Sequence, residues 1–247
     1  MKPQIFVIFP LAALALTATL ASADPAKPVR HVVYHFDVSM TSTLTTHSSG
    51  VDDGTGGSGL ADYSGGSADK GTIALDVLQV GSDGGLAVQV TETAQNNRSA
   101  KATTCLVYND GRLNCDPNGK VNEEEMALLQ VASRDFVDPT QFDAHKHWRV
   151  GGSSNGFTTS TDYTLTGGDP AGVVTIALQR VDKVEGAQGY NATTDGTVTY
   201  DVPLSIPTAV KEDAVMRQNR GMGQDNRVDT HITLNLISDS LANAKKS

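Results

Sequence analysis

An alternation of apolar and polar residues with a period of two constrains the fold of this chain more than any other feature. It is clearest in HVVYHFDVSM at residues 31–40, where Val32, Tyr34 and Phe36 share one face of an extended chain and His35 lies on the other. Successive side chains of a strand point to opposite sides, so this pattern predicts an antiparallel strand with one buried and one exposed face.

The same pattern recurs along the chain and predicts a sheet of about ten strands. An antiparallel sheet of this size twists and curls, and its apolar face has to be covered. The predicted fold is therefore mainly β: a curled antiparallel meander forming a half-barrel or open barrel, with one covering helix. The further strand segments are residues 43–48, 72–80, 86–94, both sides of a turn at 109–111, 157–166, 173–184, 190–202, 208–219 (which also fits a helix) and 227–238.

One helix is predicted, at residues 123–134. Asn122 is a suitable N-cap, and Glu125, three residues later, completes a capping box. Met126 and Leu129 give this helix a narrow apolar face. We expect that face to turn toward the sheet.

Two nearly identical phrases occur in distant parts of the chain, GTIALDV at 71–77 and GTVTYDV at 196–202. If they occupy equivalent strands, the domain consists of two five-strand halves, about residues 30–116 and 157–240, joined by a helical segment at 117–150. The other interpretation is chance, because glycine, threonine and β-branched residues are ordinary in strands and turns. The sequence leaves both interpretations open.

The two cysteines lie in CLVYNDGRLNC and predict a disulfide within one hairpin. With a three-residue loop at 109–111, Tyr108 faces Arg112, and counting outward places Cys105 opposite Cys115. Directly opposed residues of an antiparallel pair lie within disulfide reach. We expect the bridge to form in an oxidising compartment.

The N-terminal segment predicts export. An apolar run ends in the small residues Ala21 and Ala23, the pattern that a signal peptidase cleaves. Residues 1–23 are therefore interpreted as a signal peptide and residues 24–247 as a single mature β-rich domain, periplasmic or extracellular. No transmembrane anchor is expected after cleavage.

Charge and motifs exclude several classes of function. The chain has 28 acidic and 19 basic residues, a formal net charge of −9, so a nucleic-acid partner would be repelled. The sequence contains neither an HExxH motif nor a GxxxxGK[ST] phosphate-binding loop. We therefore predict a protein that is not an enzyme and needs no cofactor.

Two segments carry weak metal-binding signals. In DAHKHW, an extended chain would place Asp143, His145 and His147 on one face, but no fourth ligand is evident and exposed histidines in a linker are the alternative. GGSGLAD at 56–62 resembles a calcium-binding repeat, with the acid one position late and a single copy. We predict no metal site, and the composition of residues 50–69 favours a mobile loop.

The apparent signal peptide, the meander GTVTYDVPLSIP and the helix at 123–134 together resemble the half-barrel folds of exported lipoprotein carriers and lipid-binding envelope proteins. The resemblance implies a non-enzymatic protein that holds a hydrophobic ligand, a lipid or an apolar polypeptide on a concave sheet face. The residues expected to line that face are Val32, Tyr34, Phe36, Ile73, Leu75, Met126, Leu129, Val198, Tyr200, Leu234 and Leu236.

The alternative function is a structural or surface-assembly module that meets envelope proteins through its sheet edges or its glycine-rich loop. In that case the same apolar residues fill a closed core and no ligand is held. Alternation alone does not distinguish the two functions, because a strand with one buried face alternates whether or not a ligand is held.

Overall fold

The computed structural model describes residues 28–46, 63–82, 85–95, 102–108, 112–132, 146–154, 157–169, 171–186, 189–221 and 224–244. In this part of the chain eleven strands form a single antiparallel sheet, accompanied by two helices. The strands are β1 (Arg30–Thr46), β2 (Tyr63–Val80), β3 (Leu86–Ala94), β4 (Thr103–Val107), β5 (Leu113–Cys115), β6 (His147–Ser154), β7 (Phe157–Gly168), β8 (Val173–Val184), β9 (Tyr190–Asp201), β10 (Ile206–Gly221) and β11 (Gln224–Asp239), and the helices are α1 (Glu123–Val131) and α2 (Ser240–Ala244).

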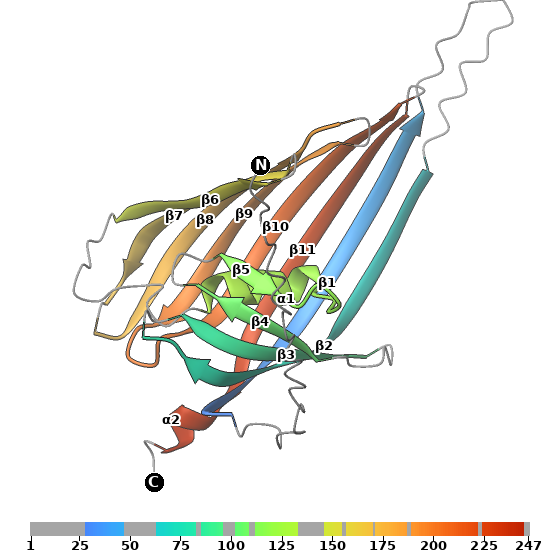
Figure 1. Cartoon of the computed structure of the whole chain (residues 1–247). Coiled ribbons are helices and arrows are strands. Elements are labelled where there is room, and N and C mark those ends of the chain that lie inside the picture. Colours follow the sequence, from blue (N-terminus) through green and yellow to red (C-terminus); the bar gives the residue numbers. More distant parts are fainter. Residues whose placement is uncertain are drawn as a thin grey trace, which may run out of the picture.

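The first and last strands lie side by side at the centre of the sheet. The strand order is β5-β4-β3-β2-β1-β11-β10-β9-β8-β7-β6, so the sheet is not closed and has β5 and β6 at its edges. The Arg30 guanidinium donates two hydrogen bonds to the buried Asp239 carboxylate, at 3.0 and 2.6 Å, and so ties the start of β1 to the end of β11. The sheet curls around α1 (Figure 1). The predicted fold class is thus confirmed.

Several predicted boundaries were wrong in the N-terminal half. Residues 43–46 continue β1 without a break, so they form no separate second strand. β2 begins at Tyr63, inside the segment predicted as a mobile loop, and pairs with β1 from its first residue. Backbone hydrogen bonds to a long neighbouring strand need no particular side chains, which explains why a Ser/Gly-rich stretch extends. The calcium-like motif at 56–62 lies outside the described residues.

In the C-terminal half, β6 was not predicted, and its first four residues lie in the segment predicted to join the two halves. It pairs with β7 along its whole length, and Trp148 stacks on Tyr163 with ring centroids 5.3 Å apart. β10 is a strand, as one of the two interpretations of 208–219 predicted. The described helix α1 ends at Val131, three residues earlier than expected.

The hairpin prediction is confirmed. Cys105 and Cys115 face each other across β4 and β5 and form a disulfide, with a Cα–Cα distance of 4.0 Å. The Tyr108 amide donates to the Arg112 carbonyl at 2.9 Å, as expected for the predicted loop. The bridge holds the three-residue β5 onto the sheet.

The two repeated phrases lie in β2 and β9, each with an inward-facing glycine. A Cβ on Gly71 would lie 2.9 Å from the Phe36 ring, and one on Gly196 would lie 3.0 Å from Leu178, so neither site has room for a side chain. However, β2 follows one strand whereas β9 follows three strands after α1. The phrases therefore share a local packing arrangement but not an equivalent place in the strand order, and duplication stays a hypothesis from the sequence.

Candidate functional site

The concave face of the sheet divides into two ends, an apolar end and a polar end. At the apolar end, inward side chains from most strands form one core cluster. The buried Tyr34 hydroxyl donates to the Pro207 carbonyl at 2.8 Å, so its polar atom is satisfied. Of the residues predicted to line a ligand, the partly exposed Leu236 packs against this cluster, and the partly exposed Met126 is not part of it. The others are buried in the cluster: Val32, Tyr34, Phe36, Ile73, Leu75, Leu129, Val198, Tyr200 and Leu234.

Helix α1 completes the apolar core from inside the curve of the sheet (Figure 1). Leu128 and Leu129 are fully buried, and Ala127 and Val131 are almost fully buried. The sequence pattern predicted only a narrow apolar face, since it assumed that one side of the helix would be covered. A helix lying inside a curled sheet is enclosed on several sides, so Leu128 was missed.

At the polar end, the same strands turn hydrophilic side chains inward. Arg180 of β8 donates to Gln130 of α1 at 2.7 Å, to Asp182 at 3.1 Å and to Thr194 at 3.2 Å. Its nearest approach to the buried Glu212 of β10 is 3.5 Å. These contacts connect the last turns of α1 to three strands of the sheet.

Glu212 is the most buried acid of this network. Its Oε2 atom has no hydrogen-bond partner, and burial raises the pKa of the carboxyl group, an effect that the Arg180 charge partly opposes. Burial acts in this direction because it removes water from around the charged form of the carboxyl group.

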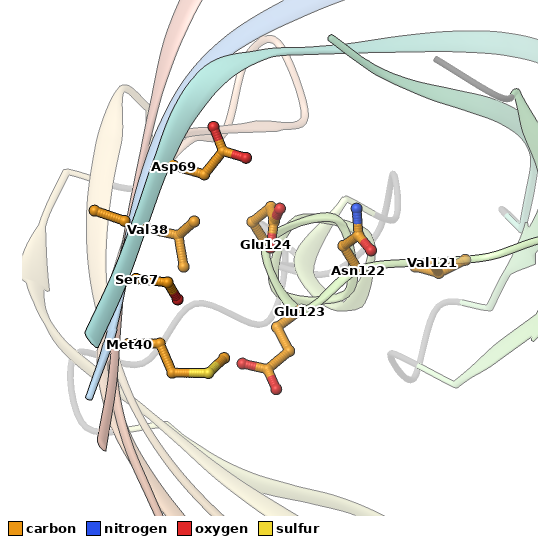
Figure 2. A pocket seen from close by; sticks show the side chains of 9 residues that line it. Val38, Met40, Ser67, Asp69, Val121, Asn122, Glu123 and Glu124 are labelled. Atoms are coloured by element: carbon orange, nitrogen blue, oxygen red, sulfur yellow. The ribbon is translucent and has the colours of Figure 1, made fainter. Parts of the chain in front are cut away.

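A groove opens on the concave face beside the start of α1, with a volume of about 400 Å³. Figure 2 shows strand side chains on one side of it and the first residues of α1 on the other, with the Glu123 side chain reaching toward Met40. No lining residue carries a positive charge. We call it the acidic groove, and its lining consists of Val38, Met40, Ser67, Ala68, Asp69, Val121, Asn122, Glu123 and Glu124.

The acids at the start of α1 are held in place by hydrogen bonds. The Asn122 side chain donates to Glu92 of β3 at 2.7 Å, and its backbone N–H donates to Glu125 at 2.8 Å, which confirms the predicted capping box. Burial raises the pKa values of Glu124 and Glu125 to about 7; for Glu124 a hydrogen bond and the charge of Glu92 add to this effect. Two carboxyl groups share a hydrogen bond only when one is protonated, so Glu124 is a proton-binding group near neutral pH.

The sequence showed the acids of the first helical turn but not the groove. Of these acids, only Glu125 was given a role, as part of the capping box, and Asp69 fell within a segment predicted as a loop. Only the pairing of β1 with β2 brings Met40 opposite Ser67 and thereby builds the opposite wall. That register could not be derived from a stretch without alternation.

Of the three weak metal candidates, only His147 lies in the described part of the chain. His147 starts β6 and lies 3.2 Å from Asp162, which also accepts two hydrogen bonds from Arg149, both at 2.7 Å. Asp143 and His145 lie outside the described part. Within that part, no group of three His, Cys, Asp or Glu side chains is arranged to hold a metal ion, and no helix has the length and apolarity needed to cross a bilayer.

No known protein family matches this chain, and no curated protein is similar to it. Among solved structures, an outer membrane channel from Pseudomonas putida F1 is similar to it with a TM-score of 0.27 and 10% sequence identity, over 87% of this chain and 97% of the channel. A likeness of this size does not define a common fold. The resemblance to lipoprotein carriers gains no support from a family match.

Proposed function

We propose that this chain is an exported, non-enzymatic binding protein whose concave sheet face holds a ligand with an apolar body and a positive charge. The acidic groove is the observation that carries the proposal. Met40, Val38 and Val121 offer apolar contact surface there, while Asp69 and the acids of α1 offer negative charge. The disulfide supports an oxidising compartment.

The ligand site differs from the one that the apolar residues suggested. Side chains such as Ile73, Val198 and Leu234 are fully buried against one another, which supports a core role for them. The acidic groove lies farther along the same concave face. An anionic ligand is disfavoured, since both the groove and the net charge of −9 would repel it.

Protonation of Glu124 couples ligand binding to pH. Its pKa of about 7 means that the carboxyl becomes charged as pH rises through neutrality. A cation binds the charged form better, so we expect affinity to increase between pH 6 and 8 and binding to release protons. An alkylammonium probe stays protonated over this range, as lysine does.

The probe pair octylammonium and octanoate tests the proposal, because the two share a chain length and differ in charge. We expect calorimetric titration to show octylammonium binding at least about tenfold more tightly, which corresponds to about 1.4 kcal/mol. Asp69→Asn should weaken octylammonium binding about three- to tenfold, as expected for a single charge contact. Asp37→Asn, on the opposite face of β1, is the matched control and should change it less than twofold.

Equal affinity for octanoate, or no binding of either probe, would contradict the proposal. The second outcome would favour the other candidate function, a structural or surface-assembly module. Full burial of Val32, Phe36 and Leu129 supports that candidate, because a filled apolar core leaves no room for a hydrophobic ligand among them.

A further inference from the structure

Strand β2 extends well beyond its neighbour β3. The two strands pair from Gly71 to Val80, and the Gln95 amide adds a hydrogen bond to the Lys70 carbonyl at 2.7 Å. From Tyr63 to Asp69, β2 pairs with β1 on one side, and no described strand pairs with it on the other. This stretch is therefore a free edge within the described residues, and Figure 1 shows it at the margin of the sheet.

The backbone of this edge presents its hydrogen-bonding groups at regular intervals. In an antiparallel strand, the N–H and C=O of one residue point to the same side, and that side alternates from residue to residue. The Lys70 carbonyl points toward β3. By alternation, the backbone groups of Ser64, Gly66 and Ala68 point to the same side, where β3 no longer runs.

The acidic groove reaches this edge. Its lining includes three consecutive residues of β2, namely Ser67, Ala68 and Asp69. Successive side chains of a strand point to opposite faces, so Ser67 and Asp69 turn their side chains toward the concave face. Ala68, an exposed residue between them, also belongs to the lining, so the groove reaches this stretch of β2.

We propose that the ligand of the acidic groove is an extended polypeptide segment that adds as a further strand to the edge of β2 at Tyr63–Asp69. This inference rests on the proposed function and names the ligand class. A strand placed there turns every second side chain toward the groove, where basic residues meet Asp69, Glu123 and Glu124. The side chains between them point away from the groove.

Two observations favour a polypeptide over a lipid or other small amphiphile. Alternating backbone donors and acceptors at strand spacing are matched by another polypeptide backbone, which is the basis of recognition by strand addition. In addition, edge strands are commonly protected by proline, lysine or a bulge. Residues 64–68 read SGGSA, without proline or charge, and pair with β1 in an unbroken register.

The test uses the disulfide-bonded protein and the peptide acetyl-TKTVTKT-amide, whose lysines and valine share one face. Two N-methylated forms are compared with it, one methylated at the lysines and valine and the other at the threonines. Each form blocks one hydrogen-bonding edge of the peptide. We expect one form to lose at least tenfold in affinity and the other to stay within threefold, since only one edge can pair with β2. Equal affinities of the two forms, whether retained or lost, would overturn the inference.

A substitution on the protein provides the matching test. Gly66→Pro removes an edge N–H without changing the lining of the groove, while Gly66→Ala keeps that N–H and places its Cβ in ordinary contact, 3.5 Å from the Met40 carbonyl oxygen. We expect Gly66→Pro to weaken peptide binding at least tenfold, Gly66→Ala less than threefold, and neither to change octylammonium binding. Circular dichroism and hydrogen-exchange protection of β1 amides check that both variants fold.

The remaining outcomes distinguish this inference from the proposed function. Binding of octylammonium without binding of the peptide overturns the strand-addition inference and leaves the proposed function in place. Binding of neither overturns both. Concentration-dependent dimers of the protein alone, abolished by Gly66→Pro, would assign the edge to a second copy of the chain and overturn the inference as well.

Discussion

The apolar end and the polar end of the concave face are built from the same strands, yet the apolar end is tightly packed and the polar end is partly open. On β1, Tyr34 and Phe36 are fully buried, whereas Met40, two inward positions farther along than Phe36, is partly exposed. On β11, Leu234 belongs to the core while the buried inward residue four positions earlier is Thr230. The comparison teaches that alternation reports which side of a strand faces inward, but not whether the space inside is filled.

The side chains that cover the concave side of the sheet decide whether an end is tightly packed or partly open. At the apolar end, α1 supplies Leu128 and Leu129 to the inner face, and the disulfide hairpin adds buried Cys105 and Val107. At the polar end, the side chains of α1 that meet the strands are acids and Gln130. A polar wall around a partly open space can admit a ligand, whereas a close-packed apolar core cannot.

Truncating one residue of β1 at each end should give the largest difference in the free energy of unfolding between the two ends. Phe36→Ala removes a fully buried ring and should lower the free energy of unfolding by about 3–5 kcal/mol. Met40→Ala should lower it by less than about 1.5 kcal/mol, because the side chain borders the acidic groove. Urea unfolding measures both values, and similar losses from the two variants would mean that the polar end is packed like the core.

Reducing the disulfide should loosen the apolar end by a somewhat smaller amount. The closed loop is short, with a sequence separation of 10 between Cys105 and Cys115. Chain-entropy reasoning gives a stabilisation of about 2–3 kcal/mol for such a loop. Urea unfolding with and without reductant tests this value. The double variant Cys105→Ala, Cys115→Ala is the control and should not respond to reductant.

Glycine substitutions sharpen the comparison at the boundary between the ends. In Gly71→Ala, the new Cβ would lie 2.9 Å from both the Phe36 ring and the Ala94 backbone, so we expect a loss of about 1–3 kcal/mol in unfolding free energy. Gly152→Ala, in the edge strand β6, meets nothing within 4 Å and should change stability by less than about 0.5 kcal/mol. Thermal or urea unfolding of both variants checks the difference, and an equal cost would refute it.

A change in the pH dependence of stability is also expected at the polar end. The folded-state pKa of Glu124 is about 7, above its ordinary value of 4.5. Stability from this group is therefore present below about pH 4.5 and is lost as pH rises through 7. In Glu124→Gln, the unfolding free energy should fall less between pH 5 and 8 than in the wild-type protein. Glu185→Gln is the control, because its exposed carboxyl has a lowered pKa and is charged throughout this range.

Features set by nearby residues could be predicted from the sequence. The alternation in residues 31–40 gave β1 and its inward face, the spacing of Cys105 and Cys115 gave the hairpin, and Asn122 with Glu125 gave the start of α1. Each depends on residues within about ten positions of one another. The helical alternative for 208–219 was excluded only by its pairing with β9 and β11.

Features set by distant pairing could not be predicted. β6 contains two glycines and alternates weakly, and it forms a strand because β7 offers a complementary edge. The acidic groove needs Met40, Asp69 and Glu124 to come together from three separated segments. No local pattern predicts that these three residues lie close together. The sequence analysis therefore assigned the ligand to the apolar residues, whose alternation is the stronger signal. In the structure those residues form the core.

The most direct test of the difference between the two ends is methyl NMR of the protein titrated with octylammonium. The proposed function predicts chemical-shift changes at the methyl groups of Met40, Val38 and Val121, with those of Ile73, Val198 and Leu234 unchanged. Changes centred on Ile73, Val198 and Leu234, with none at Met40, would contradict it. They would mean that the apolar end opens to hold the ligand.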